Sequence, residues 1–77
     1  MMESELREIL EEIRPDINFD AETQLIDGGI LDSFDIVTLV AEINARLDIA
    51  IPAEELIPEN FNSAEALLEL LERLDEE

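Results

Sequence analysis

Residues 28 to 47 read GGILDSFDIVTLVAEINARL, and this stretch decides how the rest of the chain can fold. The two glycines favour a turn, and Asp32 stands where an N-cap side chain accepts hydrogen bonds from free backbone N–H groups. Asp35 follows three residues later, where a carboxylate meets the positive end of the helix dipole. The pattern predicts a helix that begins at Ser33 and ends at residue 47 or 48.

The predicted helix has apolar residues on two sides. At about 100° per residue, one face carries an ordinary core stripe: Ile36, Leu39, Val40, Ile43 and Leu47. Phe34, Val37 and Ala41 lie on a roughly opposite face beside Ser33. Either the preceding loop covers this second stripe, or the stripe stays open to partners as a small apolar patch. The solvent exposure of Phe34 and Val37 distinguishes the two alternatives.

Helices are also predicted on both sides of this one. Residues 3–14 have apolar positions at helical spacing, and Pro15 ends that helix. Residues 53–57 predict a short helix closed by Pro58. A last helix is expected over residues 63–74, with Asn62 and Glu65 as its capping pair. Its expected buried residues are Ala64, Leu67, Leu68, Leu71 and Leu74.

The fold class predicted from these patterns is all-α, with three longer helices and one short helix. Residues 16–31 form a long ordered loop between the first two helices, with Phe19, Leu25 and Ile26 as expected core contacts. The 77 residues, 47% of them hydrophobic, are enough for one small domain, predicted to span 1–77.

The chain is strongly acidic, with four arginines and no lysine against 22 acidic residues and a net charge of −18. Such a surface repels nucleic acid and anionic lipid headgroups, so a basic protein is the expected partner. The like charge also disfavours self-association, and a monomer is expected. No cysteine, targeting segment or apolar run of membrane-spanning length is present, so membrane insertion is not expected and a cytoplasmic location is.

Ser33 has no residue in this chain that could activate it as a nucleophile. A serine nucleophile needs a base such as histidine or lysine, and the chain contains neither. The Asp32 and Asp35 carboxylates could in principle act as acid and base, but capping explains them better. We therefore expect no catalytic residues and no enzymatic activity.

One segment resembles the start of a calcium-binding loop. Asp16, Asn18 and Asp20 occupy the first three ligand positions, but Ala21 replaces the required glycine and Asp27 replaces the bidentate glutamate. No metal site is therefore expected. A calcium sensor is kept as a hypothesis that a calcium titration would test.

The stretch LDSFDIVTLVAEINARLDIAIPAEEL, residues 31–56, resembles the acyl carrier protein superfamily around its phosphopantetheine attachment site. The resemblance covers nearly the whole chain and includes the Asp32–Ser33 pair, Asp35, Val37 and the Ile51–Pro52 turn. It implies a four-helix bundle of acyl-carrier type. It also implies that Ser33 receives 4′-phosphopantetheine from coenzyme A through a separate phosphopantetheinyl transferase.

The resemblance further implies that this chain carries an acyl or aminoacyl group as a thioester and presents it to partner enzymes. Those partners would be an adenylating ligase or other acyl-loading enzyme, and a downstream acyltransferase or synthase. Phe34, Val37 and Ala41 would be docking contacts. The carboxylates of Asp32, Asp35 and Glu42 would steer the chain toward basic residues on the partner.

Some positions depart from the pattern of fatty-acid carriers, among them Phe34, Thr38 and the segment 44–46. The stretch LIDGGILDS is more similar to discrete D-alanyl or aminoacyl carrier proteins. The cargo stays open among fatty acyl, D-alanyl, other aminoacyl and polyketide groups. The alternative hypothesis is a small acidic helical protein that binds a basic surface and is never modified.

Overall fold

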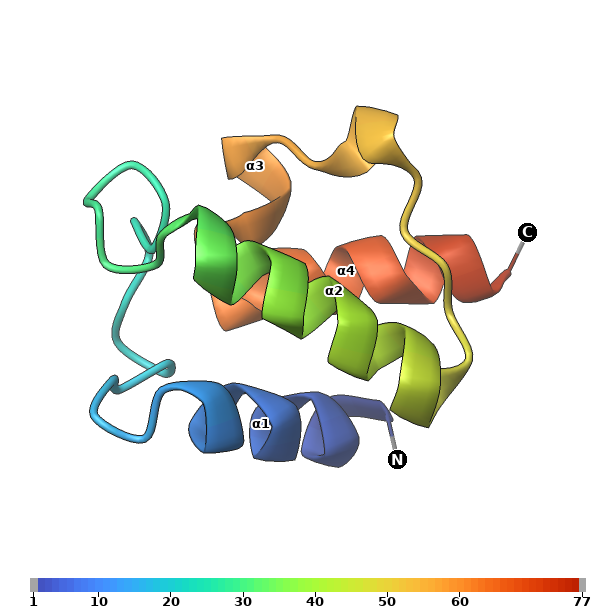
Figure 1. Cartoon of the computed structure of the whole chain (residues 1–77), viewed down its shortest axis with the longest axis horizontal. Coiled ribbons are helices and arrows are strands. Elements are labelled where there is room, and N and C mark those ends of the chain that lie inside the picture. The colour runs from blue at the N-terminus through green and yellow to red at the C-terminus, as the bar shows by residue number, and fades with distance from the viewer. Residues whose placement is uncertain (1, 77) are drawn as a thin grey trace.

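The computed structural model describes residues 2–76, and within them every regular element is helical. The elements are α1 (Met2–Ile13), α2 (Ser33–Leu47), the 3₁₀ turn η1 (Ala53–Glu55), α3 (Pro58–Phe61) and α4 (Ala64–Asp75). Figure 1 shows α1, α2 and α4 running roughly along the long axis, with α3 and η1 on the side away from α1. The predicted all-α class, with three longer helices and a short one, is confirmed. The single domain over 1–77 stays a prediction, and its ends Met1 and Glu77 lie outside the described residues.

The start of α2 forms as predicted, through reciprocal capping by two aspartates. The Asp35 backbone N–H donates to Asp32 Oδ1 at 2.9 Å, and the Asp32 backbone N–H donates to Asp35 Oδ2 at 3.3 Å. The helix ends at Leu47, and the C-cap residue Asp48 turns the chain away with a positive φ of 57° while its N–H donates to the Asn44 carbonyl. A short polar side chain tolerates this left-handed conformation better than most.

The short helix does not lie where the sequence predicted it. Residues 53–55 form only the 3₁₀ turn η1, and Pro58 begins α3 instead of closing a helix before it. Proline suits the first helical position because its fixed φ is helical and the missing N–H would have no intrahelical partner there. Ile57 before it is extended, at φ −120° and ψ 152°, as the residue preceding a proline usually is.

The capping pair predicted for the last helix is also wrong. Ser63 is the N-cap of α4, and its Oγ accepts a hydrogen bond from the Ala66 N–H at 3.0 Å. The Asn62 side chain instead bonds to the long loop, where its Oδ1 accepts the N–H groups of Ile26 and Asp27, both at 3.0 Å. Asn62 therefore fixes the loop against the α3–α4 junction.

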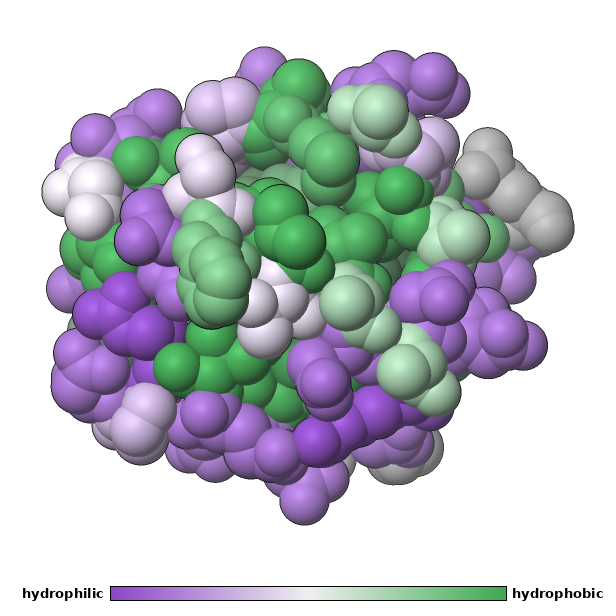
Figure 2. All heavy atoms as spheres, viewed as in Figure 1, coloured by the Kyte–Doolittle hydropathy of each residue, from purple (hydrophilic) through white to green (hydrophobic). Residues whose placement is uncertain are grey.

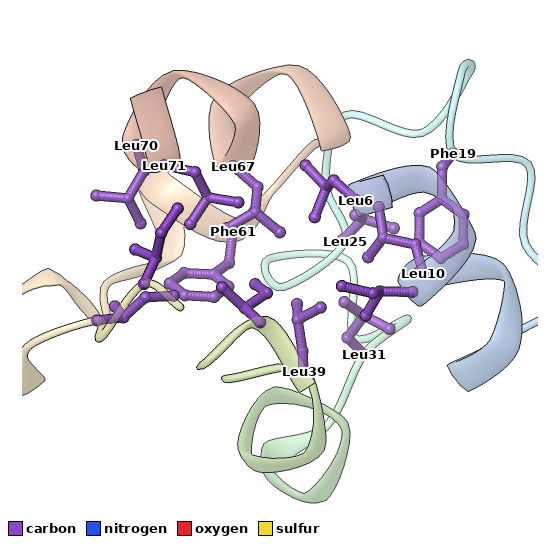
Figure 3. Packing of buried hydrophobic residues seen from close by; sticks show 14 residues of the cluster. Leu6, Leu10, Phe19, Leu25, Leu31, Leu39, Phe61, Leu67, Leu70 and Leu71 are labelled. Atoms are coloured by element: carbon purple, nitrogen blue, oxygen red, sulfur yellow. The ribbon is translucent and has the colours of Figure 1, made fainter. Parts of the chain in front are cut away.

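The core is made of side chains from all four helices and the loop (Figure 3). Phe61 of α3 lies among leucines of α4, and Phe19 of the loop lies beside Leu10 of α1. The core stripe predicted for α2 faces inward, with Leu39 and Ile43 buried. The buried core residues are Leu6, Ile9, Leu10, Phe19, Leu25, Leu31, Leu39, Ile43, Ile49, Ile51, Phe61, Leu67, Leu70 and Leu71.

The buried face of α4 differs slightly from the predicted one. Leu67 and Leu71 are buried as expected, and Leu70, which was not predicted, is buried as well. The remaining predicted positions, Ala64, Leu68 and Leu74, are half-buried and pack against the core. Leu67, Leu70 and Leu71 follow the i, i+3, i+4 spacing of one inward face, so the helix is rotated slightly from its predicted orientation.

Each of the four arginines forms an ion pair with a carboxylate of another segment. Arg46 of α2 forms a bidentate ion pair with Glu12 of α1, in which Nη1 donates to Oε2 at 2.8 Å and Nη2 donates to Oε1 at 2.7 Å. This contact lowers the pKa of the Glu12 carboxyl, because a hydrogen-bonded guanidinium favours its charged form. The other ion pairs between segments are Arg7–Asp20, Arg14–Asp35 and Arg73–Glu55, at 2.7, 3.0 and 3.0 Å.

Candidate functional site

Ser33 is the first residue of α2 and is exposed to solvent. The chain just before it is held in place, because Leu31 is buried and its N–H donates to the Leu25 carbonyl at 2.8 Å. The Ser33 hydroxyl is therefore presented on the surface from a fixed point of the backbone.

The Asp35 side chain is mostly buried and helps to fix the backbone beside Ser33. It is only 13% exposed, and its Oδ2 accepts from Arg14 Nη1 at 3.0 Å as well as from the Asp32 N–H. Asp32 is exposed, and Glu42 is half-buried and paired with Arg46 at 3.0 Å. The three carboxylates named for partner steering thus differ: only Asp32 has an exposed side chain at the helix start.

The second apolar stripe of α2 is open to solvent. Phe34 is 77% exposed and Val37 67% exposed, and Ala41 is exposed too. The alternative in which the long loop covers this stripe is therefore wrong: the loop packs at the N-terminal end of α2 and leaves this face bare. Figure 2 shows hydrophobic residues gathered over α2 and over the chain between α2 and α3.

Two further large apolar residues are exposed, and the sequence did not predict their exposure. Leu56 and Ile57 are 42% and 41% exposed in the segment between η1 and α3. We call the exposed stripe of Phe34, Val37 and Ala41 on α2 the apolar patch. The signal available in the sequence is the pair of large aliphatic residues just before Pro58, but residues 53–57 were predicted only as a short helix closed by Pro58.

The calcium-loop residues are engaged by arginines. Asp16 accepts from both Nε and Nη2 of Arg14, at 3.2 and 3.1 Å, and the guanidinium lowers the pKa of this carboxyl. Asp20 pairs with Arg7 at 2.7 Å. Within residues 2–76, no cluster of three or more acidic, histidine or cysteine side chains is arranged to hold a metal ion.

The start of α2 has the general features of a helix terminus that favours a negatively charged group. Free backbone N–H groups and the positive dipole end at a helix N-terminus favour a negatively charged phosphate. The helix is 15 residues long, and the serine hydroxyl is on its exposed first turn.

None of the helices in residues 2–76 combines the length and hydropathy that crossing a bilayer requires.

A family model described as "Phosphopantetheine attachment site" matches residues 4–71, which is most of the chain and includes Ser33. The chain belongs to the phosphopantetheine attachment family. Its members carry 4′-phosphopantetheine covalently, so this chain is a phosphopantetheine carrier. Carrier proteins of this family are not themselves catalysts.

Relatives of this family member include D-alanyl carrier proteins of streptococci. The chain is 33% identical to the one from Streptococcus sanguinis (strain SK36) and 32% identical to one from Streptococcus thermophilus (strain ATCC BAA-491 / LMD-9). Each match covers 69 residues, 88% of this chain and 87% of the relative. The resemblance to the acyl carrier superfamily, and to D-alanyl carriers within it, is confirmed.

Proposed function

We propose that this chain carries an acyl or aminoacyl group as a thioester on 4′-phosphopantetheine attached to Ser33, and presents it to partner enzymes. The observation that carries the proposal is the exposed Ser33 hydroxyl at the start of α2, directly beside the exposed Phe34. The family match and the D-alanyl carrier relatives support it.

In this proposal Ser33 acts only as the attachment point. Its hydroxyl oxygen forms the new bond to phosphorus, its proton passes to a base on the transferase, and adenosine 3′,5′-bisphosphate leaves from coenzyme A. The helix N-terminus stabilises the resulting phosphodiester charge. When attached, the group supplies a thiol that forms the thioester with the cargo, so the chain needs no catalytic residue of its own.

The apolar patch is the proposed docking surface for partners. Phe34, Val37 and Ala41 would pack against the partner, because burying exposed apolar side chains favours association. Asp32 and Glu42 would steer the encounter with a basic surface. Asp35 is proposed to support this surface by fixing the start of α2 and not by contacting the partner, because its carboxylate is already bonded to Arg14 and to the Asp32 N–H.

We propose an aminoacyl cargo, with D-alanine as the first candidate because both relatives bear that cargo in their names. The partners would then be a phosphopantetheinyl transferase, an adenylating ligase that loads the thiol, and a downstream acyltransferase. Attachment consumes coenzyme A and loading consumes ATP, which are cytoplasmic metabolites, so we propose a cytoplasmic location. The repulsion between copies of net charge −18 favours a monomer.

The test uses the apo chain, which lacks phosphopantetheine. It is incubated with coenzyme A, Mg²⁺ and a promiscuous phosphopantetheinyl transferase, and its intact mass is then measured. Wild type should gain one phosphopantetheine and Ser33→Ala none. An adenylating ligase, ATP and D-alanine should then add a hydroxylamine-sensitive D-alanyl group. A wild type that gains no group, or a Ser33→Ala variant that gains it equally, would refute the proposal.

A second candidate function uses the same surface without modification. Exposed Phe34 and Val37 in an acidic chain also suit a protein that occupies a basic groove. This hypothesis predicts partner binding that is equally tight for wild type and Ser33→Ala, and no mass gain with the transferase. The mass measurement therefore separates the two hypotheses.

A further inference from the structure

Arg14 connects three segments that meet beneath the start of α2. It follows the last residue of α1, and its N–H donates to the Leu10 carbonyl at 2.9 Å. Its Nη1 donates to the Ile30 carbonyl at 2.9 Å and to Asp35 Oδ2 at 3.0 Å, while Nε and Nη2 donate to Asp16. All three guanidinium nitrogens therefore have acceptors, and these belong to the loop start, the loop end and α2.

The two contacts made by Nη1 lie on either side of Ser33 in the sequence. Ile30 is three residues before the serine, and Asp35 is two residues after it. Asp35 Oδ2 accepts from both Arg14 and the Asp32 N–H, so the guanidinium holds the carboxylate where it caps the helix. A planar guanidinium can bond several acceptors at fixed angles, which an ammonium group cannot.

We infer that Arg14 is a positioning residue for transfer of the phosphopantetheine group onto Ser33. The inference rests on the function proposed above and extends it to a residue that does not touch the hydroxyl. Arg14 holds Ile30 and Asp35 in place, and between them the backbone of Asp32 and Ser33. Its side chain is 30% exposed and Asp35 only 13%, so this contact is better shielded from water than the other three arginine pairs between segments.

Transfer depends on this contact through conformational entropy. A transferase must hold the serine hydroxyl in line with the phosphorus atom, and a fixed segment enters that geometry without being ordered first. Without Arg14, residues 30–35 would have to be ordered during binding. This ordering cost should appear mainly as a higher KM of the transferase for the carrier. The value of kcat should change little, because residues 30–35 are ordered again once the complex has formed.

The first experiment compares Arg14→Ala with Arg7→Ala in the transferase reaction, with the apo chain as substrate. Arg7→Ala is the matched control: it removes the same charge and the ion pair Arg7–Asp20 between α1 and the loop, which is more exposed and lines a pocket beside α4. We expect Arg14→Ala to raise KM about tenfold with kcat within about twofold, and Arg7→Ala to change each by less than about twofold. Both variants are assayed well below their melting temperatures.

The second experiment measures backbone amide hydrogen exchange in the apo chain, which requires no transferase. The Asp32 and Asp35 amides donate the two capping bonds and should exchange about tenfold faster in Arg14→Ala than in wild type. The same amides in Arg7→Ala should stay within about twofold of wild type. Arg14→Lys keeps the charge without the planar fork, so it should recover melting temperature more than KM.

The outcomes separate this inference from the proposed function. If wild type receives no phosphopantetheine, the proposed function fails. If wild type is modified but Arg14→Ala matches Arg7→Ala in both KM and amide exchange, the positioning role is refuted and the carrier function stands. If Arg14→Ala does not fold at the assay temperature, Arg14→Lys is compared with Arg7→Ala by the same two measurements and the same criterion.

Discussion

Two phenylalanines of this chain occupy opposite environments, and the same substitution at each tests the fold and the docking surface together. Phe61 lies among the leucines of α4 in the core (Figure 3) and is 3% exposed, whereas Phe34 on α2 is 77% exposed. Replacing either by alanine removes the same atoms. Only the surroundings of the two rings differ, so the difference between the two losses of unfolding free energy reports how much more deeply Phe61 is buried than Phe34.

Phe61→Ala should cost about 3–5 kcal/mol of unfolding free energy, because the core cannot fill the cavity completely. A domain of this length has a total stability of roughly 4–12 kcal/mol, so this loss is a large fraction of it. Phe34→Ala should stay within about 0.5 kcal/mol of wild type, as exposed substitutions usually do. It should instead weaken binding to the transferase or ligase.

Urea unfolding followed by far-ultraviolet circular dichroism is the assay, because the chain has no tryptophan or tyrosine for fluorescence. With a slope of about 2 kcal/mol per molar urea, Phe61→Ala should lower the midpoint by roughly 2 M. A loss above about 1 kcal/mol for Phe34→Ala would show that its ring is covered in solution, against the open patch described above. A loss below that value for Phe61→Ala would refute the packing of α3.

Three further predictions concern capping, pH and salt. Asp32→Ala removes the acceptor for the Asp35 N–H and should cost about 1 kcal/mol in urea unfolding, with Asp32→Asn costing less than half of that; equal losses would argue against capping. Arg46 lowers the pKa of Glu12, so the stabilisation is complete above the ordinary glutamate value of about 4.3 and is lost as pH falls through the lower folded value. The melting temperature of Glu12→Gln should therefore fall below that of wild type at neutral pH and approach it below about pH 4; a constant difference would contradict this assignment. Added NaCl or MgCl₂ should raise the melting temperature of wild type by screening its net charge of −18, and a decrease would show that the ion pairs outweigh the repulsion.

The three longer helices could be predicted from the sequence because their determinants are local. Apolar spacing placed α1 and α4 within one residue, with Pro15 marking the end of α1, and the two aspartates of the capping box placed the start of α2 at Ser33. The short segment failed for a local reason too. Pro58 can end one helix or begin another, and the residues before it suit both.

The contacts that fix the loop could not be predicted, because they join residues far apart in the sequence. Asn62 bonds to backbone groups 35 and 36 residues away, and Arg14 reaches Asp35 across 21 residues. Helical spacing showed that α2 has two apolar faces, but it could not show which of them the loop leaves bare. The exposure of Phe34 and Val37 had to come from the fold.

The bare apolar side of α2 also bears on how this chain behaves when crowded. Between encounters with enzymes, such a side would adhere to the same side of another copy, but 22 carboxylates and only four cations keep two copies apart at low ionic strength. Added salt screens both kinds of charge repulsion. Screening within one molecule stabilises its folded state, whereas screening between two molecules lets their apolar sides come into contact. Colloidal stability and thermal stability should therefore move oppositely as ionic strength rises.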